Sequence, residues 1–153
     1  MIRAAILTLL CATAQAELLR LEFTLTGVNC VSCFESLPSR LGRVRGVDSV
    51  EVNLEKSTVK MALARGNRIR LMLLRDTLQQ DGTKVVAVRL EAEGGVGRDN
   101  GRWVFTPGPA GEQFLLPAAE KSIESASVTG TIREFPPNPE PWTIRAEVVR
   151  PRQ

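Results

Sequence analysis

Residues 19–33, LRLEFTLTGVNCVSC, join an alternating apolar stretch to a pair of cysteines. Apolar residues occupy every second position of LRLEFTL, with charged or polar residues between them. Because successive side chains of a strand point to opposite faces, this alternation predicts a half-buried β-strand. Gly27 ends the strand, and Cys30 and Cys33 follow at C-x-x-C spacing. The stretch therefore predicts a strand that leads into a loop carrying two thiols.

The residues beyond the cysteines alternate between helical and strand-like patterns. Apolar side chains recur at spacings of three and four over residues 34–44, which is typical of an amphipathic helix. Residues 47–64 alternate twice around a short polar turn and predict a hairpin. A second helix is expected after Asn67 as N-cap, with Gly82 as C-cap. With a further strand after Gly82, residues 17–93 have the β-α-β-β-α-β order of a ferredoxin-like domain.

The remaining residues, 94–153, differ in character from the first half. Short apolar runs are separated by segments rich in glycine and proline, namely GGVGRDNG, TPGPAGEQ and EFPPNPEP. Several short strands between such turns predict a small all-β domain, a barrel or a sandwich. The strand at 84–93 could be shared with this second domain. The predicted fold class is therefore α+β, a ferredoxin-like domain followed by a small all-β domain.

The N-terminal segment has the features of an export signal. Arg3 gives a positive start, a short apolar run follows, and Ala14-Gln15-Ala16 forms a small-residue cleavage site. We expect residues 1–16 to be a signal peptide, and the mature protein to be periplasmic or secreted. Cys11 allows a lipoprotein alternative, but Leu10 stands where a lipobox requires a small residue.

Composition excludes several classes of function. The chain of 153 residues has a formal charge of +3, with basic and acidic residues interleaved, so no nucleic-acid interface is expected. Histidine is absent, which removes imidazole as a base and as a metal ligand. No spacing of carboxylates indicates acid–base catalysis, and no segment after the signal could span a membrane. We therefore expect a binding protein without a transmembrane segment, and not an enzyme.

The cysteine pair is open to three interpretations. Thiolates select soft ions such as Cu(I), Hg(II), Zn(II) or Cd(II), and two thiolates suit an ion that accepts two ligands. A structural zinc site needs four ligands, and no second C-x-x-C is present. The pair could instead be a dithiol–disulfide redox couple. It could also be a structural disulfide, although so small a ring contributes little stability.

The pattern around the cysteines resembles the heavy-metal-associated domain family. GVNCVSC follows the first predicted strand, and LGRVRGVDSVEVNLEKSTVKM continues from the helix into the hairpin, over about residues 19–92. The family includes copper chaperones and periplasmic mercury-binding proteins. The resemblance implies that Cys30 and Cys33 bind the metal ion.

Several residues near the cysteines depart from that family pattern. Val28 and Asn29 replace its methionine and threonine, and Pro38 lies where the first helix should run. Proline breaks a helix interior, so the helix either begins later, with Ser36 as its cap, or is kinked. Lys84 could lie close enough to offset the negative charge of a bis-thiolate complex. Val28, Asn29 and Lys84 are therefore the candidate residues around the metal ligands.

These observations predict an exported protein that captures or transfers a soft metal ion, Cu(I) first and Hg(II) second, with Zn(II) or Cd(II) as further candidates. Its expected partners are a protein that donates or accepts the ion, and an envelope protein that contacts the C-terminal β domain. Two alternatives are an envelope scaffold with a vestigial or disulfide-bonded cysteine pair, and a thiol–disulfide redox protein.

Overall fold

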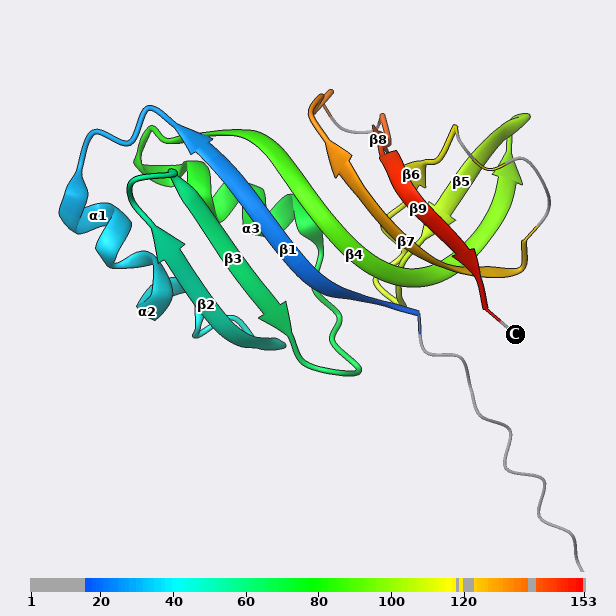
Figure 1. Cartoon of the computed structure of the whole chain (residues 1–153), viewed down its shortest axis with the longest axis horizontal. Coiled ribbons are helices and arrows are strands. Elements are labelled where there is room, and N and C mark those ends of the chain that lie inside the picture. The colour runs from blue at the N-terminus through cyan, green and yellow to red at the C-terminus, as the bar shows by residue number, and fades with distance from the viewer. Residues whose placement is uncertain (1–15, 118, 120–122, 138–139, 153) are drawn as a thin grey trace, which may run out of the picture.

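The computed structural model describes residues 16–117, 119, 123–137 and 140–152 (Figure 1). The signal peptide expected at 1–16 lies outside these residues except for Ala16. The strands are β1 (Glu17–Thr26), β2 (Val47–Asn53), β3 (Thr58–Leu63), β4 (Lys84–Asp99), β5 (Arg102–Thr106), β6 (Phe114–Leu115), β7 (Ser125–Ile132), β8 (Trp142–Thr143) and β9 (Arg145–Pro151). The helices are α1 (Val31–Glu35), α2 (Leu37–Leu41), α3 (Leu71–Leu78) and the short 3-10 helix η1 (Gln79–Asp81).

All the strands belong to one mixed sheet, in which β4 is the central and longest member. On one edge β4 pairs with β1, from Thr26↔Lys84 to Glu17↔Glu93, and then with β5 from Gly95 onward. On its other edge β4 pairs with β7, from Val88 to Gly95. The sheet continues outward through β1 to β3 and β2, and through β7 to β9. Figure 1 shows β4 as a long curved strand that runs through the whole molecule.

The predicted fold class, a ferredoxin-like domain followed by a separate small all-β domain, is wrong. The described chain is mostly β and forms one nine-stranded sheet. The boundary expected at 93/94 falls inside β4, which continues to Asp99. The segment GGVGRDNG, which the sequence indicated as a flexible turn, is mostly strand, and the turn itself is confined to Asn100 and Gly101. Because β4 passes without interruption from β1 to β5, the two halves cannot separate.

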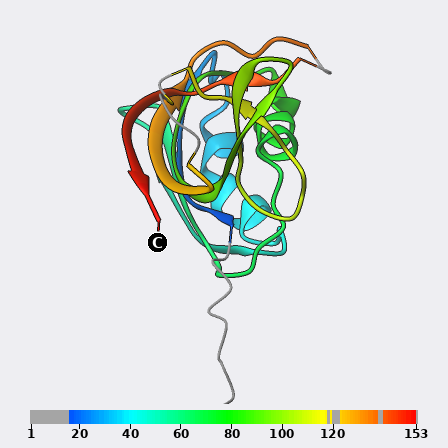
Figure 2. The same cartoon turned by 90° about the vertical axis from the view of Figure 1, so that its right-hand side faces the viewer.

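The C-terminal strands return to β4 through strand pairings and one chain connection, that between β8 and β9. β8 and β9 are separated by Ile144 alone, yet β8 pairs with β6 and β9 pairs with β7. The path β4–β5–β6–β8–β9–β7 therefore ends on β4 again. In Figure 2 these strands are nearest the viewer and curve around one another.

Gly94 lies where β4 passes from pairing with β1 to pairing with β5. A Cβ atom at this position would lie 2.3 Å from the carbonyl oxygen of Thr106 and 2.9 Å from the Cα of Pro107. Both neighbours are backbone atoms, which cannot move aside as a flexible side chain can. Only glycine allows the two chains to approach this closely.

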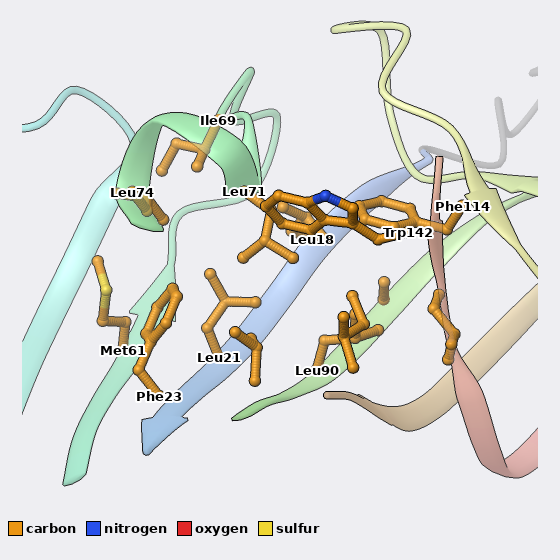
Figure 3. Packing of buried hydrophobic residues seen from close by; sticks show 14 of the residues in the cluster. Leu18, Leu21, Phe23, Met61, Ile69, Leu71, Leu74, Leu90, Phe114 and Trp142 are labelled. Carbon is orange, nitrogen blue, oxygen red and sulfur yellow. The ribbon is translucent and has the colours of Figure 1, made fainter. Parts of the chain in front are cut away.

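One hydrophobic core runs under the whole sheet. The odd-numbered residues of β1 from Leu21 to Leu25 are buried, whereas Arg20, Glu22 and Thr24 alternate with them on the other face. The buried face of β1 packs against helical residues such as Leu71 and Leu74, and the cluster continues into the second half of the chain. Figure 3 shows Leu18 and Leu71 beside Phe114 and Trp142, so both halves share this core.

Helix α3 begins later than the sequence predicted. Asn67 was expected as its N-cap, but α3 starts at Leu71. The buried Asn67 amide instead donates to the carbonyls of Leu18 (2.8 Å) and Ala64 (2.9 Å). The helix is capped by Glu112, whose carboxylate accepts the N–H groups of Leu71 (2.6 Å) and Met72 (3.0 Å). A carboxylate from the second half of the chain thus satisfies two of the free donors at the start of the helix.

None of the helices in the described part of the chain is long and apolar enough to cross a membrane.

Candidate functional site

Two loops that are distant in sequence meet at one end of the sheet. The loop after β1 carries the cysteines, and the segment 79–83 leads into β4. Thr26 and Lys84 form the last pair between these strands, so both loops leave the sheet at the same end of the strands. A Cβ atom on Gly27 would lie 3.6 Å from the carbonyl oxygen of Gly82. The strand pairing therefore brings η1 against the cysteine loop, as the upper left of Figure 1 shows.

Cys30 and Cys33 are joined by a disulfide, with their Cα atoms 5.2 Å apart. Cys30 is the N-cap residue of α1, and its sulfur accepts the backbone N–H of Cys33 at 3.2 Å. The hydroxyl of Ser32 lies 3.2 Å from the same sulfur. One turn of helix therefore places both sulfurs at a single point, with two polar groups directed at Cys30.

The surroundings of the cysteines form a very small depression. Its volume is about 10 Å³, which holds roughly one water molecule. A depression of this size could accept a single ion or one atom of a partner. It is lined by Val28, Asn29, Cys30, Cys33, Phe34, Leu37, Leu78, Asp81 and Thr83.

The predicted first helix is divided into two short ones. Ser36 ends α1 and also occupies the N-cap position of α2, without a capping bond from its side chain. Its hydroxyl donates instead to the carbonyl oxygen of Cys33 at 2.7 Å. Pro38 lies in the first turn of α2, where its missing N–H costs no helical hydrogen bond. The helix therefore restarts at Leu37, which also lines the depression.

A charged pair closes one side of the depression. The carboxylate of Asp81, in η1, accepts a hydrogen bond from Arg40 of α2, with 2.5 Å between Nη1 and Oδ2. The other guanidinium nitrogen of Arg40 lies 3.3 Å from the amide oxygen of Gln80 and 3.4 Å from the carbonyl of Thr77. Arg40 therefore fastens α2 to the turn that carries Asp81.

The structure brings together some of the residues that the sequence indicated, but not all. Val28 and Asn29 line the depression with both cysteines, whereas Lys84 is exposed and is not among the lining residues. Sequence reasoning missed Asp81 and its partner Arg40. The only signal for Asp81 was its place next to Gly82, the predicted C-cap, since the register of β1 and β4 decides what the cysteines face.

The donor set limits which ions this site could hold. Among the described residues, no three His, Cys, Asp or Glu side chains are grouped so as to bind a metal ion. Two converging sulfurs remain, and they would be available as thiolates once the disulfide is reduced. Two sulfur ligands suit Cu(I) or Hg(II), whereas tetrahedral Zn(II) requires further donors.

The sequence matches no protein-family model, no curated protein and no solved structure. The resemblance to the heavy-metal-associated domain family stays a prediction from the sequence around the C-x-x-C motif.

Proposed function

We propose that this is an exported protein, located in the periplasm or outside the cell, that captures or transfers a soft metal ion through Cys30 and Cys33. The observation that supports it most is the position of the C-x-x-C pair, with Cys30 as the N-cap residue of α1 and both cysteines lining one small depression. Cu(I) is the first candidate and Hg(II) the second, because both accept two sulfur ligands.

The groups around the sulfurs favour an anionic ligand. The backbone N–H of Cys33 and the hydroxyl near Cys30 can donate hydrogen bonds to a thiolate, and donors of this kind stabilise its charge. The lining residues Phe34, Leu37 and Leu78 are buried, so water cannot reach the depression through the protein interior. Bound in this way, the ion would be partly shielded yet still reachable from outside.

Transfer requires that a partner protein can approach the ion. Val31, between the two cysteines, is 55% exposed, and Cys30 itself is only partly buried. A thiolate of the partner would attack the bound Cu(I) and form a three-coordinate intermediate. One of the two cysteines then leaves, and a second partner thiolate replaces the other. No other chemistry is needed, so the proposed function is not enzymatic.

The disulfide favours a second candidate, a thiol–disulfide redox function. In that case the disulfide accepts two electrons from a partner dithiol, which becomes oxidised while both cysteines become thiols. The same reduction is needed before Cu(I) can bind, so a cellular reductant of dithiol type is a required partner in either case. An envelope protein that contacts the C-terminal strands stays a prediction.

A competition experiment tests the proposal. Fully reduced protein, lacking residues 1–16, is titrated with Cu(I) against a chromophoric chelator, beside a Cys30→Ser/Cys33→Ser variant. Tight binding of one ion per chain, lost in the variant, is the expected result. Equally weak binding by both proteins contradicts the metal function. Catalytic reduction of insulin disulfides by the wild-type chain, without tight Cu(I) binding, favours the redox candidate.

A further inference from the structure

The negative charge of Asp81 sets a condition for binding at the cysteine pair. A complex of Cu(I) with two thiolates carries a charge of −1, since two negative ligands surround one positive ion. Asp81 lines the same small depression as Cys30 and Cys33. Like charges that share one depression disfavour each other, so an unneutralised carboxylate on Asp81 would weaken an anionic complex.

Arg40 neutralises this carboxylate and also fixes its position. Its guanidinium pairs with Asp81 and reaches Gln80 and Thr77, so it holds the whole turn against α2. The side chains of Arg40 and Asp81 are 30% and 38% exposed, so solvent screens the pair in part and its contribution to stability is small. The main effect of the Arg40–Asp81 pair is to neutralise the negative charge of Asp81 in the depression that the cysteines line.

The restart of the helix at Leu37 explains why Arg40 occupies this position. Leu37 and Leu41 are buried on the inner face of α2, and residues three apart lie on nearly the same side of a helix. Arg40 is therefore close to the face that Leu37 turns toward the depression. Pro38, which departs from the family pattern, belongs to the first turn of the helix that carries Arg40.

We propose that Arg40 is a positioning residue of the metal site, which raises the affinity for a bis-thiolate complex by pairing with Asp81. This inference rests on the proposed function. It assigns to Arg40 the charge-compensating part that the sequence suggested for Lys84, which is exposed and outside the lining of the depression.

Three variants separate the charge effect from a structural one. Arg40→Met leaves Asp81 uncompensated, and we expect Cu(I) affinity to fall by about tenfold, equivalent to one pKa unit of electrostatic interaction. Asp81→Asn should bind at least as tightly as wild type. Arg40→Met/Asp81→Asn should recover wild-type affinity within about threefold, because the repulsive charge is gone. The loss in Arg40→Met should also shrink at high salt.

Controls keep the outcome interpretable. Arg89→Met removes an exposed arginine that pairs with Glu147 at 2.7 Å on the outer face of the sheet, and it should leave the affinity unchanged. Arg40→Lys retains the positive charge and should keep most of the affinity if Arg40→Met folds poorly. If Arg40 were only structural, the double variant would bind as weakly as Arg40→Met, since both lack the contacts to Thr77 and Gln80. That result, or an unchanged Arg40→Met, would overturn the proposal.

A second measurement does not depend on metal binding. Each protein is equilibrated with glutathione, where two glutathione molecules reduce the disulfide and form one glutathione disulfide. At about pH 9, where an ordinary cysteine thiol is largely ionised, Arg40→Met should shift this equilibrium toward the protein disulfide, because thiolates in the reduced form then face an uncompensated carboxylate. If wild type binds no Cu(I), the proposed function fails, and this equilibrium still decides whether Arg40 acts on the cysteine pair. An unchanged equilibrium contradicts that action.

Discussion

The two ends of β1 differ in how far their carboxylates are buried. The strand has ten residues, so its ends lie about 30 Å apart at 3.3 Å per residue. At the Glu17 end, the carboxylates of Glu17 and Glu93 are buried or nearly so and pair with arginines that reach solvent. At the cysteine end, polar and sulfur atoms are partly exposed around a small depression.

The Glu17 end closes the sheet. The carboxylate of Glu17 is 1% exposed, accepts the N–H of Gly66 at 2.5 Å, and pairs with Arg65 at 2.8 Å. Glu93, opposite Glu17 in the register, pairs with Arg152 at 2.8 Å. The next residue, Gly94, is the close approach to β5. A buried carboxylate requires a charged partner of this kind.

At the cysteine end the carboxylate itself is exposed to solvent. Its charged pair, Arg40 and Asp81, is about one third exposed, and Val31 extends into solvent. Groups that meet a partner protein cannot be fully buried, so the proposed function places metal binding at the cysteine end and structural pairing at the Glu17 end. Substitutions at the Glu17 end should affect stability and leave metal binding intact, and substitutions at the cysteine end should do the reverse.

The largest effect is expected for Gly94→Ala at the Glu17 end. The new methyl group would meet the Thr106 backbone at 2.3 Å, so strands must move apart, and we expect a loss of about 3 kcal/mol in unfolding free energy. Gly97→Ala is the matched control in the same strand, because nothing lies within 4 Å of its Cβ position. Urea denaturation measures both. Equal stability of the two variants would contradict a close approach of the Thr106 backbone to Gly94.

A smaller effect is expected for Glu17→Gln. The substitution keeps the size of the side chain but loses a charged hydrogen-bond acceptor, which should cost about 2 kcal/mol. Glu22→Gln on the outer face of the same strand should cost less than about 0.5 kcal/mol, because Glu22 faces Lys60 at 3.9 Å in partly exposed surroundings. The Cu(I) affinity of Glu17→Gln should equal that of wild type. A large loss of affinity would show that the two ends are coupled.

The smallest effect concerns Glu112, which caps α3 between the two ends. Burial raises the pKa of its carboxyl above the ordinary value, against the opposing hydrogen bonds from Met72 and Leu71. A raised pKa means that this group stabilises the fold fully below its unfolded pKa, and that the contribution is lost as pH rises through the folded pKa. Glu112→Gln should therefore cost little at pH 7.

The pH dependence of the unfolding free energy tests whether the pKa of Glu112 is raised. As pH falls from 7 to 4, wild type should gain stability relative to Glu112→Gln, because its carboxyl becomes neutral like the amide. Glu112→Ala loses the cap at any pH and should cost about 1 kcal/mol. A wild-type protein that loses stability relative to Glu112→Gln as the pH falls would contradict the burial of the charge.

Local patterns predicted the elements better than their arrangement. Alternation predicted β1 and the hairpin of β2 and β3, and Gly82 is the left-handed cap of η1 with φ of 79°. The signals failed where distant residues compete for the same group. Asn67 has the sequence of a cap, but its amide is used by Leu18 and Ala64, and the capping group is Glu112.

The arrangement of the sheet depended on long-range pairing. Nothing in residues 125–132 indicates that they pair with residues 88–95 of β4, and this pairing joins the two halves. The cysteine pair was evident from its spacing alone, whereas Asp81 and Arg40 required the register of β1 with β4 and the division of the helix before Pro38. Sequence therefore indicated the cysteine pair, and the fold supplied its surroundings.

The most direct measurement is X-ray absorption at the copper edge, on the reduced protein lacking residues 1–16 and thus Cys11, loaded with one equivalent of Cu(I). The central claim is that Cys30 and Cys33 alone hold one ion. It predicts a nearest shell of two sulfur atoms with no nitrogen or oxygen, and the loss of this shell in Cys30→Ser/Cys33→Ser. A shell of oxygen or nitrogen atoms, or an unchanged spectrum in the variant, would contradict it.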